Sequence, residues 1–405
     1  MNHAGAAPTV ARAFALLCLV AAWTAYMPLG LKYFAYLGLG VLAAWWVASH
    51  MMLPAVLRWP PMSLLLALCL MLMVSAAWSG APSADIASHV WHYSRALFMP
   101  LIAWACPPDA ARRGLRHFAV ASALVAVLTV VHALHLLPDS EVWSSTVTSI
   151  GNQRIVTSLL LALGVVLALI ESADASATRA HRLAWLCTAC ISALGLAMQD
   201  RRTGMIALPL LLVVLAIASQ RSWRRSAATL AGMVLLAALV WHQADGVRAR
   251  FAEGLAELRA YEPTGVVATS WGMRVRMAEL TLDMVRDAPL FGHGLGSWVS
   301  EWQSRAQGGS LLEGQRSPHN EYLLIAAQAG LGALALWLGV LAAALLDAWR
   351  AGRRGAAALM VWTAIAWSAL FNVVIRDATF GTPLLLLAGL AMAASRQGTR
   401  SSDDH

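Results

Sequence analysis

Charged residues are scarce in this 405-residue chain, and lysine is almost absent. Only 12% of the residues are Asp, Glu, Lys or Arg, while 59% are hydrophobic. Soluble domains carry about twice that share of charge, so the composition indicates an integral membrane protein. Lys32 is the only lysine, and the net charge of +8 therefore comes almost wholly from arginine. The chain contains no basic soluble module interleaved with aromatic residues, which argues against nucleic acid as a partner.

Cysteine is also sparse, and none lies in the one long polar stretch. Nearly all five fall inside apolar runs: Cys18, Cys69, Cys106, Cys187 and Cys190. This placement argues against a disulfide framework. Cys187 and Cys190 have the spacing of a redox pair, but they lie in the middle of an apolar run. We therefore expect neither a redox nor a metal-binding role for them.

Apolar runs of roughly 16–25 residues, long enough to cross a bilayer, occur along the whole chain. They predict an all-α integral membrane protein with about twelve transmembrane helices. The first run leads directly into further spans, so we expect an uncleaved first helix rather than a signal peptide. The predicted spans are 13–28, 33–50, 61–79, 86–105, 116–137, 154–171, 183–199, 204–218, 226–242, 321–346, 356–375 and 381–395.

These spans divide the chain into four regions. Residues 1–242 carry nine spans, 243–320 form a polar region with short helices, 321–395 carry three more spans, and 396–405 form a tail. Fifteen of the 29 basic residues fall in tails and short loops on one side. Basic loops stay in the cytoplasm, so we expect both termini there and the polar region on the periplasmic face.

Four arginines depart from this charge rule, because they fall in short connections on the external side. They are Arg154, Arg201, Arg202 and Arg376. Charge beside apolar helix ends is costly. A single one could be explained by a side chain that reaches into the headgroup layer. As a set, the four arginines indicate convergence on an anionic ligand.

The polar region carries eight arginines. Helical periodicity with charged faces predicts helices over Gly246–Ala260 and Met273–Asp287. A glycine-rich turn follows at Pro289–Gly296, where glycine permits a close backbone approach. We expect the aromatic side chains of Trp298, Trp302 and Tyr322 to lie near this turn.

Short motifs follow one another in a fixed order between about residue 150 and residue 380. They are Gly151-Asn152-Gln153-Arg154, Gln199-Asp200-Arg201-Arg202-Thr203-Gly204, Trp271-Gly272-Met273-Arg274, the turn Pro289–Gly296, Pro318-His319-Asn320-Glu321-Tyr322, and Gly330-Leu331-Gly332. In this order they resemble the motifs of the O-antigen ligases. The superfamily also includes O-antigen polymerases and O-linked protein oligosaccharyltransferases. Arg201 stands where the family commonly has a small hydroxyl residue, which leaves open which arginine of the pair acts.

The resemblance implies a glycosyltransferase of the bacterial inner membrane whose active site faces the periplasm. The donor would be a glycan on undecaprenyl pyrophosphate, and the acceptor would be lipid A–core oligosaccharide. By motif position, Arg154, Arg202 and Arg274 would be functional arginines and His319 the functional histidine. We add Arg201 to the pyrophosphate-binding candidates. Secondary candidates are Arg276, Arg376, Asn320 and Tyr322.

The residue types suit this chemistry. Breaking the bond between a sugar C1 and pyrophosphate produces an anion, which arginine can bind through two parallel hydrogen bonds. The attacking hydroxyl is a weak nucleophile, and His319 is the natural general base, since burial and neighbouring arginines favour its neutral form. The acids of the polar region show no D-x-D pattern. We therefore expect no metal cofactor and an inverting, single displacement.

Three alternatives stay open at this point. An O-antigen polymerase would use the same chemistry, but the short 138–153 connection lacks the second long loop that polymerases usually show. A protein O-oligosaccharyltransferase is disfavoured because no additional periplasmic region follows the last span. A transporter of lipid-linked glycans, from another functional class, usually shows repeat symmetry or charges at mid-membrane, and neither is evident here.

Overall fold

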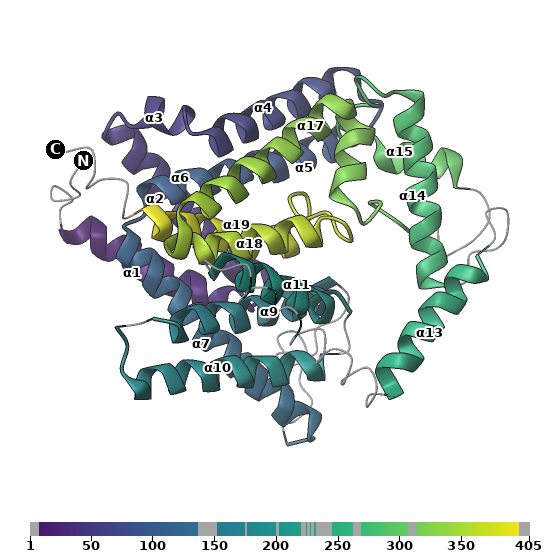
Figure 1. Cartoon of the computed structure of the whole chain (residues 1–405). Coiled ribbons are helices and arrows are strands. Elements are labelled where there is room, and N and C mark those ends of the chain that lie inside the picture. The colour runs from purple at the N-terminus through teal and green to yellow at the C-terminus, as the bar shows by residue number, and fades with distance from the viewer. Residues whose placement is uncertain are drawn as a thin grey trace.

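The computed structural model describes residues 8–136, 152–174, 176–199, 202–219, 245–261, 269–306 and 314–396, with Arg224, Ala227 and Ala231. All regular structure in these residues is helical (Figure 1), which confirms the predicted all-α fold class. The helices form an elongated bundle with a smaller group of helices across one end.

Seven helices in the described ranges are long and apolar enough to cross a membrane. They are α2 (Leu29–Ser49), α4 (Pro60–Ser75, continued by a 3-10 turn to Trp78), α7 (Pro108–Ala133), α9 (Asn152–Ser172), α10 (Arg179–Met198), α17 (Glu321–Arg350) and α19 (Ala378–Ser395). Two further apolar helices are shorter, α1 (Pro8–Thr24) and α11 (Arg202–Ser219). A short helix α3 (Leu53–Leu57) connects α2 to α4.

The remaining predicted spans differ from this picture, so the count of twelve is not confirmed. The span predicted over 226–242 lies outside the described residues, apart from Ala227 and Ala231. The one predicted over 86–105 is split into α5 (Ser83–Ser94), a 3-10 turn and α6 (Phe98–Ala105). Pro100 has no backbone N–H to donate to the Ala96 carbonyl, so a continuous helix would lose a hydrogen bond there.

The span predicted over 356–375 is helical only in its first part, α18 (Ala356–Ser368). Residues 369–377 leave the helix and run as turns to the start of α19. The backbone groups of this segment find partners on the first residues of α17, as described below. The predicted helix is therefore wrong in its last turns, and the difference matters because this segment forms part of the candidate site.

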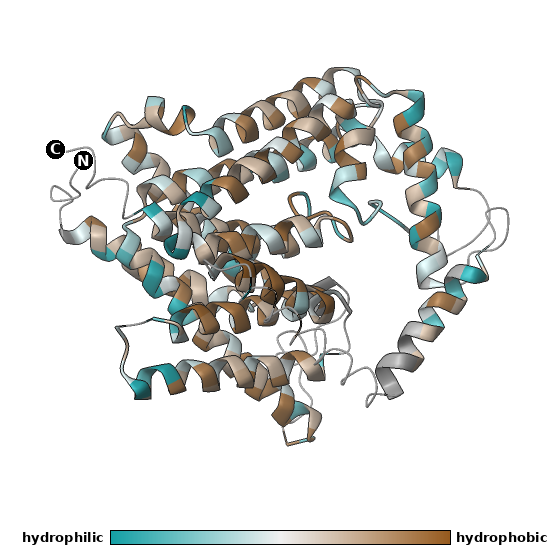
Figure 2. Ribbon diagram, in the orientation of Figure 1, coloured by the Kyte–Doolittle hydropathy of each residue, from teal (hydrophilic) through white to brown (hydrophobic). Residues whose placement is uncertain are grey.

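Three helices lie across the end of the bundle, and we call them the outer layer. They are α13 (Asp245–Arg259), α14 (Ser270–Asp287) and α15 (Trp298–Arg305). The first two confirm the helices predicted in the polar region. The bundle end that carries the outer layer is opposite to the end where α1 begins and α19 stops (Figure 1). Hydrophilic residues are frequent on α14 and α15, whereas the bundle helices are mostly apolar (Figure 2).

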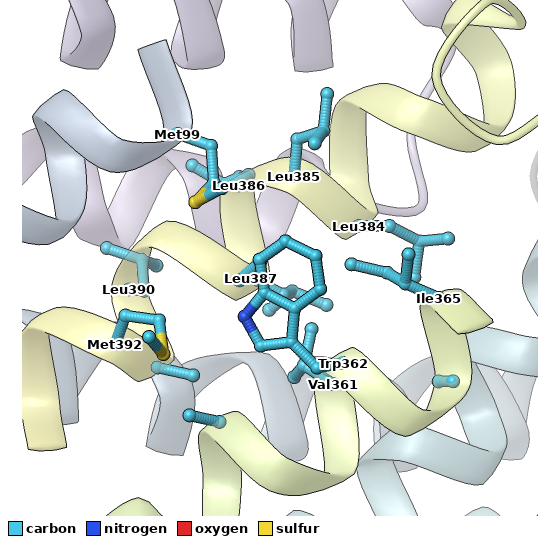
Figure 3. Packing of buried hydrophobic residues seen from close by; sticks show 14 of the residues in the cluster. Met99, Val361, Trp362, Ile365, Leu384, Leu385, Leu386, Leu387, Leu390 and Met392 are labelled. Carbon is cyan, nitrogen blue, oxygen red and sulfur yellow. The ribbon is translucent and has the colours of Figure 1, made fainter. Parts of the chain in front are cut away.

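The core of the bundle surrounds α19, which is apolar on all sides and almost completely buried. A helix with no polar face has to be enclosed by other helices or by lipid. In Figure 3 the indole ring of Trp362, from α18, lies among Leu384 and Leu387 of α19. Gly389 allows α6 to approach, because a Cβ there would lie 3.0 Å from the Met99 carbonyl oxygen.

The outer layer shares a small core with the first part of α17, which contributes Leu324 and Ala327. The rings of Trp298 and Trp302 are stacked with centroids 5.1 Å apart, and both side chains are buried. Trp298 donates from its indole nitrogen to the hydroxyl of Thr281 on α14, at 3.0 Å. These two tryptophans follow the glycine-rich turn directly and are buried in this small core.

The glycine-rich turn docks on a break in α17. The helix is interrupted at Gly330, whose φ of 80° and ψ of 179° are accessible almost only to glycine. Leu331 donates its backbone N–H to the Pro289 carbonyl at 2.8 Å, and Gly294 donates to the Gln328 carbonyl at 2.9 Å. The break therefore exchanges helical hydrogen bonds for bonds to the turn. The predicted close backbone approach at Pro289–Gly296 is confirmed.

Candidate functional site

A pocket of about 210 Å³ lies between α14 and two segments that are not helical. Its α14 wall has residues spaced as one face of a helix. The opposite walls come from the residues just before α17 and from those just after α18. The lining residues are Trp271, Arg274, Val275, Ala278, Pro318, His319, Asn320, Leu370 and Phe371. Two predicted site residues, Arg274 and His319, thus share one pocket, and Asn320 joins them.

His319 has an unusual backbone conformation, with φ at 50°. A residue other than glycine in this left-handed region is uncommon, and such residues concentrate at functional sites. Burial and the nearby charge of Arg274 lower the pKa of His319, while Asp377 acts in the opposite direction. The side chain is therefore biased toward the neutral form, which is the form that accepts a proton. This agrees with the expectation from the sequence.

Asn320 holds the start of α17. Its side-chain oxygen accepts a hydrogen bond from the Leu323 N–H at 3.0 Å, as a helix N-cap does. Its side-chain nitrogen donates to the Leu370 carbonyl at 3.1 Å. Asn320 therefore links the His319 segment to the opposite wall of the pocket. These contacts give it a structural task that the sequence motif alone did not specify.

Glu321, which does not line the pocket, also connects the start of α17 to the segment after α18. Its backbone N–H donates to the Ala369 carbonyl at 2.8 Å, and its carboxylate accepts from the Ile375 N–H at 2.8 Å. The hydroxyl of Tyr93, on α5, donates to the other carboxylate oxygen at 3.0 Å. The Glu321 side chain is 0% exposed.

Glu321 and Tyr93 were not among the site residues predicted from the sequence. A signal was available for Glu321, since it opens a thirty-residue apolar helix, where a buried carboxylate requires partners. No signal pointed to Tyr93, because α5 lies far away in the sequence.

Three secondary candidates lie outside the lining of the pocket. Arg276 forms an ion pair with Glu279, with 3.8 Å between Nη1 and Oε2. Arg376 donates from Nη1 to the Arg316 carbonyl at 2.9 Å, and so ties the chain after α18 to the chain before α17. Tyr322 donates from its hydroxyl to the Ala366 carbonyl on α18 at 2.8 Å.

Arg154 and Arg202 occupy the starts of two adjacent helices. Arg154 is the third residue of α9, and Arg202 is the first residue of α11. The helices are in close contact near these ends, because a Cβ on Gly204 would lie 2.3 Å from the Ser158 carbonyl oxygen. Arg201 lies outside the described residues. The convergence of the arginines on one anion stays a prediction.

Several acids of the outer layer form hydrogen bonds or ion pairs with neighbouring side chains. Glu279 accepts a hydrogen bond from the Tyr261 hydroxyl at 2.5 Å. Arg305 pairs with Asp287 at 2.6 Å and with Glu301 at 3.1 Å. Within the described ranges, no three His, Cys, Asp or Glu side chains come together as metal ligands would. Arg274 is the arginine among the residues that line the pocket.

The comparison with known protein families gives a match that includes most of this site. Residues 187–338 match the family described as O-antigen ligase. This region of the chain is similar to O-antigen ligases. The match supports the resemblance to the O-antigen ligase family that the ordered motifs indicated. No curated protein sequence matches the chain.

The matched region contains Arg202, Arg274 and His319, while Arg154 lies before it. It runs from α10 through the outer layer to the middle of α17. Both walls of the pocket that carry polar groups therefore belong to the matched region. The wall made by Leu370 and Phe371 comes from beyond it.

Proposed function

We propose that this protein is an O-antigen ligase of the bacterial inner membrane. It transfers a glycan from undecaprenyl pyrophosphate to lipid A–core oligosaccharide on the periplasmic side. The observation that carries the proposal is the pocket in which His319 faces the helix that bears Arg274. A proton acceptor and a fixed positive charge in one small space suit a displacement that releases an anion.

In the proposed reaction, His319 acts as the general base. One ring nitrogen takes the proton from an acceptor hydroxyl, and the hydroxyl oxygen attacks C1 of the first donor sugar. The bond between C1 and the pyrophosphate oxygen breaks, and the electron pair leaves with the diphosphate. The configuration at C1 is inverted, because attack and departure occur on opposite faces in one step.

Arginine meets the charge of the leaving group. Arg274 lies in the pocket, and Arg154 and Arg202 begin helices that lie side by side. We propose that all three bind the pyrophosphate, with Arg201 as the alternative to Arg202. Fixed cations of this kind stabilise the anion most when the C1–O bond is breaking, so they act mainly on the transition state. A metal cofactor is not required by this scheme.

The apolar part of the pocket suits the sugar. Trp271 and Phe371 line it together with Val275, Ala278 and Leu370. Aromatic side chains offer a flat apolar face with a polar rim, which complements the apolar face of a pyranose ring. The donor lipid reaches the site from the membrane, and we place the outer layer on the periplasmic side with both termini in the cytoplasm.

The test is transfer by the purified protein in liposomes. The donor is a glycan on undecaprenyl pyrophosphate, and three acceptors are offered separately: lipid A–core oligosaccharide, a second lipid-linked glycan, and a serine-containing peptide. We expect product only with lipid A–core. Product only with the second glycan would make the protein a polymerase, and product only with the peptide a protein oligosaccharyltransferase.

Two further measurements complete this test. Movement of intact donor across the bilayer without any transfer would replace the ligase with a transporter. A chelator is added to the transfer assay to examine the proposed independence from metal. Loss of transfer with chelator and recovery with magnesium or manganese would contradict the role given to the arginines.

A further inference from the structure

We propose that Glu321 is a positioning residue for the transfer reaction, and that its buried carboxylate, together with Tyr93, holds His319 and the Leu370–Phe371 wall in working geometry. The inference rests on the proposed function. Glu321 does not line the pocket, so it acts through the two segments that do. Its role is distinct from that of His319, which exchanges the proton.

The pocket depends on two chain segments that are not helical. The first, 317–320, carries His319 in its left-handed conformation, and the second, 369–377, carries Leu370 and Phe371. Strained or irregular backbone persists only where its surroundings fix it. At membrane depth, the backbone groups freed by such breaks also need partners in the protein. The position of Glu321 meets both requirements.

Glu321 contacts the second segment at both of its ends. Its backbone N–H bonds Ala369, two residues before Phe371, and its carboxylate bonds the N–H of Ile375, four residues after Phe371. The segment is thereby held as an arch whose middle lines the pocket. Two residues earlier in the chain stands His319, so displacement of Glu321 moves both walls together.

Tyr93 fixes the carboxylate from the bundle side. Its hydroxyl donates to Oε1 of Glu321, and its side chain is buried. Arg95, two residues later, donates from Nη2 to the Ile375 carbonyl at 2.8 Å. The start of α17 and the arch are therefore both tied to the stretch that joins α5 to α6. This explains why a polar, broken stretch persists in an otherwise apolar part of the chain.

The experiment compares Glu321→Gln and Tyr93→Phe with Tyr26→Phe. Tyr26 is a matched control, because its side chain is also buried and its hydroxyl also donates to a side chain, that of Ser122 on α7 at 2.7 Å, away from the pocket. Each protein is purified in detergent, its thermal unfolding is recorded, and kcat, donor KM and the dependence of kcat/KM on pH are measured.

We expect Glu321→Gln to lower kcat by about 100-fold, the effect of a misplacement of about 1 Å at a reaction centre. Tyr93→Phe should lower it by about 10-fold, because the bond to Ile375 remains. Donor KM should change little in both. The acidic limb of kcat/KM should move to higher pH, since water gains access to His319. Tyr26→Phe should match the wild type in all of these.

Other results overturn the inference. Wild-type kcat and an unchanged pH profile in both Glu321→Gln and Tyr93→Phe would show that the carboxylate positions nothing needed for transfer. An increase in donor KM that accounts for the whole loss would make Glu321 a binding residue. The same loss in Tyr26→Phe would reduce the effect to general stability. Failure of the proposed function is separate, because it would appear as no transfer to lipid A–core oligosaccharide by the wild-type protein.

Discussion

The helix α9 and the pair α17 and α18 differ in how their backbone polar groups find hydrogen-bond partners in an apolar environment. α9 is an uninterrupted apolar helix, and its middle is buried among its neighbours. α17 breaks at Gly330, and α18 stops at Ser368, well before the end of its apolar run. Backbone groups freed at such breaks are costly in an apolar environment unless other parts of the protein bind them.

The partners of the freed groups show where the molecule needs irregular structure. At Gly330 they come from the glycine-rich turn, and after Ser368 they come from Asn320 and Glu321. The continuous helices give the bundle its shape. The interrupted helices give the pocket its walls. Substitutions at the breaks should therefore impair transfer more than substitutions of similar size in α9.

The largest effect is expected at His319. His319→Gly removes the imidazole, and glycine adopts the φ of 50° without strain, so folding should be preserved. General base catalysis is typically worth about 10²–10⁴-fold, and we expect kcat to fall by that factor. Free imidazole added to the assay should restore part of the rate, because it can accept the proton in the vacated space.

His135 provides a matched control. It is also a histidine with positive φ, at 58°, but it follows α7 and does not line the pocket. His135→Gly should transfer glycan at the wild-type rate. Near-normal transfer by His319→Gly at normal abundance would remove His319 from the mechanism.

The next effect is expected at the arginines. Alanine at Arg154, Arg202 or Arg274 removes a charge-assisted contact to the leaving group, at a cost of about 2–4 kcal/mol, or about 30- to 1,000-fold in kcat. Lysine should restore only part of the rate, because it keeps the charge but loses the planar fork. Donor binding, measured separately, should weaken less than kcat.

Arg286 is the control for this series, since it lies on the same helix as Arg274 and pairs with Asp283 at 2.7 Å on an exposed surface. Arg286→Ala should leave transfer unchanged. Wild-type rates in all three alanine variants would exclude a shared pyrophosphate site.

The sequence predicted the helices far better than it predicted the breaks. Apolar length alone located most of the bundle, and periodicity located α13 and α14, because both signals are local. The end of α18 was missed, since residues 369–375 are apolar enough to continue a helix. What stops the helix is the set of hydrogen bonds from Asn320 and Glu321, which are distant in sequence.

In the candidate site, too, local motifs were predictable and contacts between distant segments were not. His319 and Arg274 were predicted from motifs, and the pocket brings them together. The tasks of Asn320, Glu321 and Tyr93 depend on contacts between segments, so a single sequence could not reveal them. Trp298 and Trp302 were expected only to lie near the glycine-rich turn, and the structure shows that they are buried in the core between the outer layer and α17.

A stability effect of intermediate size is expected at the break in α17. A Cβ on Gly330 would lie 2.1 Å from the Leu290 carbonyl oxygen, and φ is 80°. We expect Gly330→Ala to destabilise the folded protein by about 1–3 kcal/mol from the backbone conformation alone, and to impair transfer through the displaced turn. Thermal unfolding of the purified protein measures the first effect.

Gly352 is a control that has the unusual backbone conformation without the close contact. It also has a positive φ, at 59°, but nothing lies within 4 Å of its Cβ position. Gly352→Ala should therefore show a smaller decrease in unfolding temperature and normal transfer. Equal decreases in the two variants would mean that the approach of the turn to α17 contributes nothing.

The smallest effect, and the most specific, concerns pH. Burial and the charge of Arg274 lower the pKa of His319 below its ordinary value of 6.5, against the opposing influence of Asp377. A general base works only when it is unprotonated, so the acidic limb of kcat/KM should lie below pH 6.5, and transfer should be lost as pH falls through the lowered pKa.

Arg274→Gln removes the positive charge that helps to lower the pKa of His319, and the acidic limb of this variant should move upward, toward 6.5. Arg274→Lys keeps the charge and should keep the limb of the wild type. Both variants lose the fork, so their plateau rates fall together and only the position of the limb distinguishes them. Identical limbs in the two variants would show that the charge of Arg274 does not act on His319, and would separate the two functions assigned to this pocket.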